Sequence, residues 1–316
     1  MSLQRFVLKR TLITIPLLLG ISLLTFGMVH AIPGDPIDFI TLFIELDPQT
    51  EAEIRAQYGL DKPVYVQYID WVISAAMLDF GNSIITRRPV TAEILNRLPY
   101  TLLMGSMAFA VTVSTAIPAG IAAAYYRNTI IDQFSRVFAL VGIALPNFWL
   151  GLLLILVFAS WLGLFPVLPP TGRGLLSADM IIYTLLPAIA IGTGATALMM
   201  RLMRSSMVEE LDKDYVRTAR AKGLPERTIV GKHVLRNSLI SVVTVAAIQI
   251  AFIISGSVVV EIVFSYPGIG RLLVNRVGNR DFPVIQGIVL IIGVAVILAN
   301  LIADVLYAYL DPRIRY

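Results

Sequence analysis

The stretch MIIYTLLPAIAIGTGATALMM, residues 180–200, contains no Asp, Glu, Lys or Arg. About 20 apolar helical residues cross about 30 Å of hydrocarbon, and an ionisable group at mid-bilayer is costly. Five comparable stretches lie at residues 11–34, 98–126, 137–172, 237–260 and 282–303. Each can hold one helix, and none easily holds two, because even the longest ends in the loop-like FPVLPPTG. The sequence therefore predicts an all-α polytopic membrane protein with six transmembrane helices.

Composition supports this interpretation. The 316-residue chain is 57% hydrophobic, with a mean hydropathy of +0.79, which exceeds what a soluble core of this size can bury. The excess must face lipid or another membrane subunit. Pro118, Pro146 and Pro187 fall inside the second, third and fourth predicted spans, where each removes a backbone donor and is expected to kink its helix. Such kinks can be mechanistic or merely structural.

The distribution of Lys and Arg predicts the orientation. Of the 25 basic residues, 16 fall on the side that carries both termini and 9 on the other, so the termini are expected to be cytoplasmic. The amino-terminal RFVLKR, an apolar run and VHA together resemble a cleavable secretory signal, but the run is long enough to span, and we interpret it as an uncleaved first helix.

Residues 31–97 then form an external segment with ten acidic and five basic residues. Within this segment, TEAEIRAQYGL has a helical pattern that Gly59 should stop, and Pro63 can open the next helical piece. The net negative charge can attract a binding protein or a cationic solute, or serve solvation alone.

Residues able to support catalysis or bind metal are scarce. The chain has no cysteine, and its only histidines, His30 and His233, are predicted to lie on opposite sides of the membrane, so no multi-histidine metal site is expected. GKH at residues 231–233 lacks the leading Gly and the final Ser or Thr of a phosphate loop. SGS at residues 255–257 has no nearby histidine to act as a base and is better explained as a packing motif. We predict no catalytic, cofactor or metal site in this chain.

A dense charged segment, DYVRTARAKG, occupies residues 214–223 within the cytoplasmic stretch 201–236. Leu211, Tyr215 and Ala219 recur every four residues, which predicts one amphipathic helix from Val208 to Lys222. Gly223 suits a left-handed position just past its end, and Pro225 suits the first turn of a helix that continues into the fifth span.

This helix, turn and helix could be a solvated loop, a DNA-reading unit or a docking element for a soluble cytoplasmic partner. A solvated loop does not need a capped, two-sided helix. A DNA reader fused between two membrane spans could hardly follow a groove, so a nucleic-acid partner is not expected. A docking helix explains both faces and is the favoured interpretation.

Several motifs resemble one known family. They are IPGDP after the first span, FGNSIITRRPVTAEILNRLPYTL before the second, ALPNFWLG in the third, DYVRTARAKGL and HVLRNSL in the cytoplasmic segment, FSYPGIGRLL after the fifth span, and RDFPVIQG and LDPRIRY near the end. In this order they resemble the first permease subunit of the dipeptide, oligopeptide and nickel importers of the ATP-binding-cassette (ABC) class. The resemblance covers nearly the whole chain, as one domain of residues 1–316 with type I ABC importer permease architecture.

The resemblance implies that residues 201–236 are a coupling segment that inserts into a groove of the ATPase. The positions it singles out for this contact are Asp214, Tyr215, Arg217, Thr218, Ala219, Arg220, Gly223 and Leu224. Against the broad importer pattern, Arg217 and Thr218 replace a Glu and an Ala, a departure shared by the peptide branch of the family.

It also implies a set of partners in a prokaryotic inner or plasma membrane. These are membrane lipid, a homologous second permease, two ATPase subunits that bind ATP and Mg, and an external solute-binding protein. Peptides are the leading solute, with oligosaccharides or nickel as alternatives within the class.

The fifth predicted span is the candidate for the translocation path. At about 100° per residue, one face carries Ser238 and the candidates Ser241, Thr244, Gln249, Ser255 and Gly256. A polar stripe can face solute or pack against another helix, and both interpretations stay open. Glu261 and Asp304, near span ends, are expected to be interfacial or paired. An ion-gradient-driven transporter is the alternative of another class, but it would usually carry paired ionisable groups at mid-membrane, and these stretches have none.

Overall fold

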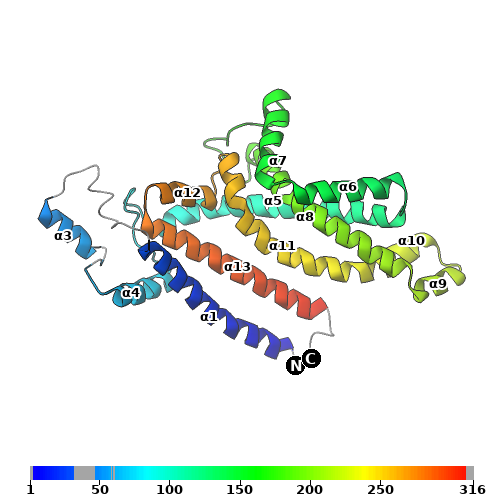
Figure 1. Ribbon diagram of the computed structural model, residues 1–316, viewed down its shortest axis with the longest axis horizontal. Helices are drawn as coiled ribbons and strands as arrows, with labels where there is room; N and C mark the ends of the chain where they lie inside the picture. Colours follow the sequence, from blue (N-terminus) through cyan, green and yellow to red (C-terminus); the bar gives the residue numbers. More distant parts are fainter. Residues whose placement is uncertain (1–2, 32–46, 58, 60, 311–316) are drawn as a thin grey trace.

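The computed structural model describes residues 3–31, 47–57, 59 and 61–310, and within these ranges the chain is helical with connecting turns (Figure 1). Among the described residues, the β-structure consists of one isolated antiparallel bridge between Asn82 and Pro89. The predicted all-α class is therefore confirmed. The motif IPGDP and the last six residues lie outside the described ranges.

Four helices are long and apolar enough to cross a membrane, and a bent pair makes up to five in the part of the chain that could be searched. The four are α1 (Leu3–His30), α5 (Val90–Tyr125), α8 (Ala178–Leu211) and α13 (Phe282–Leu310). They coincide with the first, second, fourth and sixth predicted spans. The fifth prediction falls within α11 (Leu235–Val263), where many side chains from residue 244 to 257 lie outside the described ones.

The third predicted span is not one helix, and that expectation for residues 137–172 is wrong. Helix α6 (Ile130–Ala144) is followed by α7 (Asn147–Leu154) and a π-helical turn, η1 (Ile155–Trp161), and the two parts meet at 105°. Pro146 causes the break because it lacks an N–H and disfavours helical geometry at the residue before it; Leu145 is extended, with ψ of 127°. The kink expected at Pro146 is thus a full break.

The long helices separate two ends of the molecule (Figure 1). Helices α3 (Pro48–Gln57), α4 (Val64–Ala76) and α12 (Ile269–Gly278) lie toward one end, with the start of α5. Helices α9 (Asp214–Ala221) and α10 (Glu226–Thr228) lie at the other. Helix α8 contacts α5, α6, α7 and α11, while α13 packs between α11 and α1. Helix α8 is therefore the central element that reaches the segment carrying α9.

The predicted start and stop signals near α3 and α4 are confirmed. Gly59 has a left-handed φ of +65° just beyond α3, and Pro63 directly precedes the first residue of α4. Both signals act through the backbone of a single residue, since Gly tolerates positive φ and Pro favours a helix start.

Close packing of α5 on α8 depends on small residues. A Cβ at Gly120 would lie 2.6 Å from Met203 Cβ and 2.9 Å from the Met200 carbonyl oxygen, and a Cβ at Gly192 would lie 3.0 Å from the Ala108 carbonyl oxygen. Small residues let membrane helices approach in this way, where lipid supplies no hydrophobic driving force between them.

We expect Gly120→Ala to destabilise the protein by about 1–3 kcal/mol, because the added methyl group overpacks the α5–α8 contact. The matched control is Gly20→Ala in α1, where a Cβ would meet nothing within 4 Å. Thermal unfolding of the detergent-purified variants measures the difference. Equal midpoints for the two variants would contradict the packing described for Gly120.

Candidate coupling segment and translocation path

The charged segment contains a break that the sequence pattern did not predict. Helix α8 ends at Leu211 and α9 begins at Asp214, so the expected continuous helix from Val208 to Lys222 is wrong. Lys213 is extended, with ψ of 151°, and Arg127 Nη1 lies 3.0 Å from Asp212 Oδ2. Asp214 then lies in the first turn of α9, where a carboxylate interacts favourably with the helix dipole. The break lets α9 turn away from the axis of α8.

Helix α9 is two-sided, as its pattern predicts. Val216 is completely buried in a cluster with Met203, Met207, Ile229 and Val234, and the half-buried Tyr215 and Ala219 pack against this cluster. The opposite face exposes Asp214, Arg217, Thr218 and Arg220. One face therefore holds α9 to the membrane helices and the other is available to a partner.

Tyr215 connects three elements at the base of α9. Its hydroxyl donates to Glu210 Oε2 at 2.7 Å and accepts from Asn237 Nδ2 at 3.3 Å, while Lys213 also pairs with Glu210. Burial, followed by the hydrogen bond to Glu210, raises the pKa of Tyr215, so the hydroxyl stays a donor at neutral pH. The end of α8, the start of α9 and the start of α11 are joined through this one side chain.

The turn after α9 is a Schellman motif. Gly223 has φ of +76°, its N–H donates to the Arg220 carbonyl at 2.9 Å, and the N–H of Leu224 donates to the Ala219 carbonyl at 3.3 Å. The predicted left-handed position of Gly223 is confirmed. Leu224 is exposed next to it, at 40%.

An ion pair closes the same turn. Arg220 Nη2 and Nε lie 2.7 and 3.2 Å from the two carboxylate oxygens of Glu226. The guanidinium lowers the pKa of Glu226, so this carboxylate is ionised and paired at neutral pH. The pair is lost as the pH falls through that lowered value.

The chain then returns to the membrane without a loop. Pro225 precedes α10, which continues through a π-helical turn, η2 (Ile229–Val234), into α11. The predicted continuation into the fifth span is confirmed, and residues 231–233 lie inside η2, in helix and not in a phosphate-binding loop.

The candidate translocation residues do not share one environment. Gln249 is 9% exposed and Ser241 is exposed, whereas Thr244, Ser255 and Gly256 lie outside the residues whose side chains are described. The neighbouring Ser238 is completely buried, and Ser206 Oγ donates to its carbonyl at 3.2 Å. The polar stripe remains a prediction.

Two buried aspartates form polar contacts that the sequence did not predict. Asp132 in α6 is completely buried and binds Arg204 of α8 at 2.9 Å. At the opposite end, Asp281 is also buried and accepts hydrogen bonds from Ser83 Oγ at 2.5 Å and the Ile84 N–H at 3.1 Å. The partners in these two contacts are 72 and about 200 residues apart in the sequence, so no local pattern predicts that they meet.

Glu261 and Asp304 have partners, as expected. Asp304 lies 3.0 Å from Arg10, which joins the end of α13 to the start of α1. Glu261 is completely buried, accepts from Thr101 Oγ1 at 2.8 Å, and accepts at 3.0 Å from the Arg271 N–H in the first turn of α12. Both carboxylates therefore contribute to packing between helices.

The arrangement defines a membrane-embedded transport subunit. Among the described residues, no group of three or more His, Cys, Asp or Glu could hold a metal ion. An amphipathic helix lies at one end of a bundle of long apolar helices and exposes a charged face there. The class is that of the non-catalytic permease subunits of ABC importers.

Comparison with known proteins identifies the family. Residues 116–316 match the family described as binding-protein-dependent transport system inner membrane component, and residues 3–105 match its amino-terminal membrane domain. The chain is 45% identical over 313 residues to the glutathione transport system permease protein GsiC of Salmonella typhimurium, covering 98% of this chain and 99% of the relative. It is 44% identical over 311 residues to GsiC of Escherichia coli strain K12, with the same coverage. The chain belongs to the family of binding-protein-dependent inner membrane components.

Proposed function

We propose that this chain forms half of the translocation pathway of an ABC importer for peptides or peptide-like solutes such as glutathione. The observation that carries the proposal is 45% identity, over nearly the full length of both chains, to a permease named for glutathione transport. Oligosaccharide or nickel transport by the same class of importer is the alternative.

We further propose a topology and a set of partners. The excess of Lys and Arg at one end of the helices supports cytoplasmic termini, an external segment at residues 31–97 and a cytoplasmic coupling segment at residues 201–236. A subunit of this class works with a homologous second permease, two ATPases that bind ATP and Mg, and an external solute-binding protein, in a prokaryotic inner membrane.

In this proposal α9 is the contact with an ATPase. Its exposed residues Asp214, Arg217, Thr218 and Arg220 meet the ATPase groove, while Tyr215 and Ala219 hold the helix to α8 and α11. Gly223 and Leu224 form the turn that fixes the angle at which α9 is presented.

The solute class is tested with the binding protein that serves this permease. We expect mass spectrometry of ligand released from the natively purified binding protein to show glutathione or short peptides. We also expect ATP-dependent uptake of the released compound by the reconstituted complex. An oligosaccharide or a nickel chelate as the released ligand would overturn the peptide assignment.

We expect Gly223→Val to uncouple ATP hydrolysis from transport. A branched side chain at φ of +76° strains the turn, and α9 must shift to relieve it, although the apolar helices can still insert. The matched control is Gly231→Val, at an exposed helical site where a Cβ meets nothing within 4 Å.

Both variants are purified as assembled complexes, and ATPase occupancy and the stimulation of hydrolysis by loaded binding protein are measured. The expected result is loss of occupancy or stimulation in Gly223→Val alone. Wild-type values for Gly223→Val, with unchanged uptake, would refute a coupling role for this turn.

We expect Gln249→Leu to slow uptake while the complex still assembles, because the change removes the largest polar group of the α11 stripe at similar volume. Val243→Leu, at a half-buried position that 100° per residue places on the opposite face of α11, is the control. Initial uptake rates and complex yield separate the possible roles. Failed assembly of Gln249→Leu would show that the stripe packs helices, and unchanged uptake and yield would exclude both roles.

A further inference from the structure

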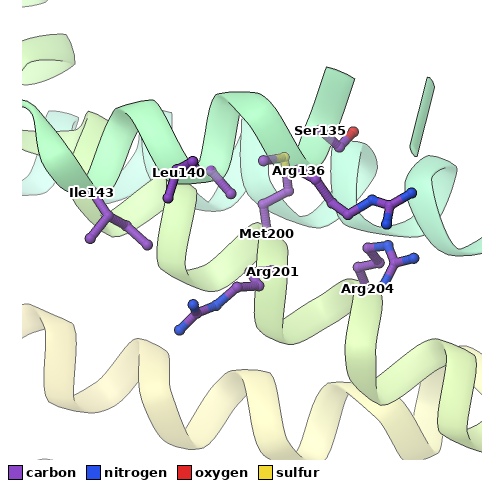
Figure 2. Close-up of a pocket in the computed structure, with 8 residues that line it drawn as sticks. Ser135, Arg136, Leu140, Ile143, Met200, Arg201 and Arg204 are labelled. Carbon is purple, nitrogen blue, oxygen red and sulfur yellow. The ribbon is translucent and has the colours of Figure 1, made fainter. Parts of the chain in front are cut away.

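A cavity of about 340 Å³ lies between α6 and α8, near the end of α8 that leads to α9 (Figure 2). Arg136 of α6 and Arg204 of α8 lie side by side at one end of the cavity, and Arg201 extends from α8 below the row of α6 side chains. The side chains of three arginines therefore line one small cavity, and Arg201 points away from Arg136 and Arg204 (Figure 2).

The cavity carries excess positive charge. The buried Asp132 binds Arg204 at 2.9 Å and Arg136 at 3.2 Å, so one carboxylate is shared by two guanidinium groups. Arg201 makes no hydrogen bond or ion pair with any other residue that the structure describes. The Arg136 side chain is 53% exposed. Three arginines and one carboxylate leave two positive charges in excess around the cavity, and Arg136 is more exposed to a ligand than the neighbouring Arg204.

The cavity lies at the boundary between hydrocarbon and headgroups. Arg136 is the last charged residue before the uncharged stretch 137–172, and Arg201 is the first after the uncharged stretch 180–200. The stretch 180–200 lies within the single helix α8 and is alone long enough to cross about 30 Å of hydrocarbon. Tyr125 and Tyr126, exposed at the end of α5 directly before α6, are of the type enriched at that depth.

The rest of the lining is apolar. Leu140 is 72% exposed and Ile143 is 49% exposed along α6, and Ala139 and Met200 close the space behind them. A free anion would neutralise the arginines but leave these side chains uncovered. A lipid acyl chain covers them while its phosphate reaches the arginines, as in basic pockets between membrane helices that hold anionic headgroups.

We propose that this cavity is a binding site for an anionic phospholipid of the leaflet nearest the coupling segment. The phosphate contacts Arg136, the positive charge of Arg201 adds to the attraction for the anionic headgroup, and an acyl chain runs along Leu140 and Ile143. The site is independent of which solute the importer carries, because its ligand enters from the bilayer.

The test uses the assembled complex in nanodiscs of phosphatidylglycerol and phosphatidylcholine. Native mass spectrometry counts the lipids that stay bound after transfer to detergent. We expect selective retention of phosphatidylglycerol by the wild type, and a loss of that selectivity of about fivefold in each of Arg136→Gln and Arg201→Gln. Lys9→Gln, which removes an exposed charge in the first turns of α1, is the control and should match the wild type.

Two further arms separate a lipid site from a free-anion site and from a contact with the second permease. Ile143→Trp keeps every charge but fills the cavity, so it should also reduce phosphatidylglycerol retention. A phosphatidylglycerol carrying a photoreactive acyl chain should label a peptide containing Leu140 or Ile143. Equal retention of both lipids by the wild type, or equal loss in Lys9→Gln and Arg201→Gln, would overturn the proposal. So would displacement by millimolar inorganic phosphate, or cross-linking of this face to the second permease in place of lipid.

Discussion

The cost of placing charge in hydrocarbon is the constraint on which this structure depends. It keeps Lys, Arg, Asp and Glu out of the long apolar stretches, and three carboxylates next to these stretches in the described part of the chain have partners. Asp132 binds two arginines, Asp304 binds Arg10, and Glu261 accepts hydrogen bonds from Thr101 and the first turn of α12. Arg201 directly follows an apolar stretch long enough to span, and the proposed coupling segment begins there.

Features set by one residue or by a long local run could be predicted from the sequence. Uncharged stretches locate α1, α5, α8 and α13 because each such stretch has few stable alternatives to a spanning helix. Gly59 and Gly223 were expected to end helices and do so with positive φ. The exposed and buried faces of α9 follow from its own residues, since helical periodicity is a local property.

Features that depend on distant contacts could not be predicted. The period from Leu211 through Tyr215 to Ala219 runs unbroken across the gap between α8 and α9, so the pattern cannot reveal that gap. Arg127 approaches Asp212 from a loop 85 residues earlier, and Arg204 reaches Asp132 from 72 residues later. The proline signal at Pro146 predicted a change of direction, but the 105° angle also reflects where α7 packs on α8 and α11, as at Gly151 beside Phe264.

The contacts of α9 determine which helices can respond when it is displaced. Val216 packs in one cluster with residues of α8 and η2, Tyr215 binds both Glu210 and Asn237, and the Arg220–Glu226 pair closes the turn toward α11. A shift of α9 must therefore move the ends of α8 and α11 together, or break the buried packing of Val216 and these polar contacts at once. The Asp132–Arg204 pair extends this unit to α6, whereas α1 is joined at this end to α13 through Arg10 and Asp304. The arginine-lined cavity lies between α6 and α8, two helices of this connected unit, so a shift passed from α9 through α8 would also change the width of the cavity.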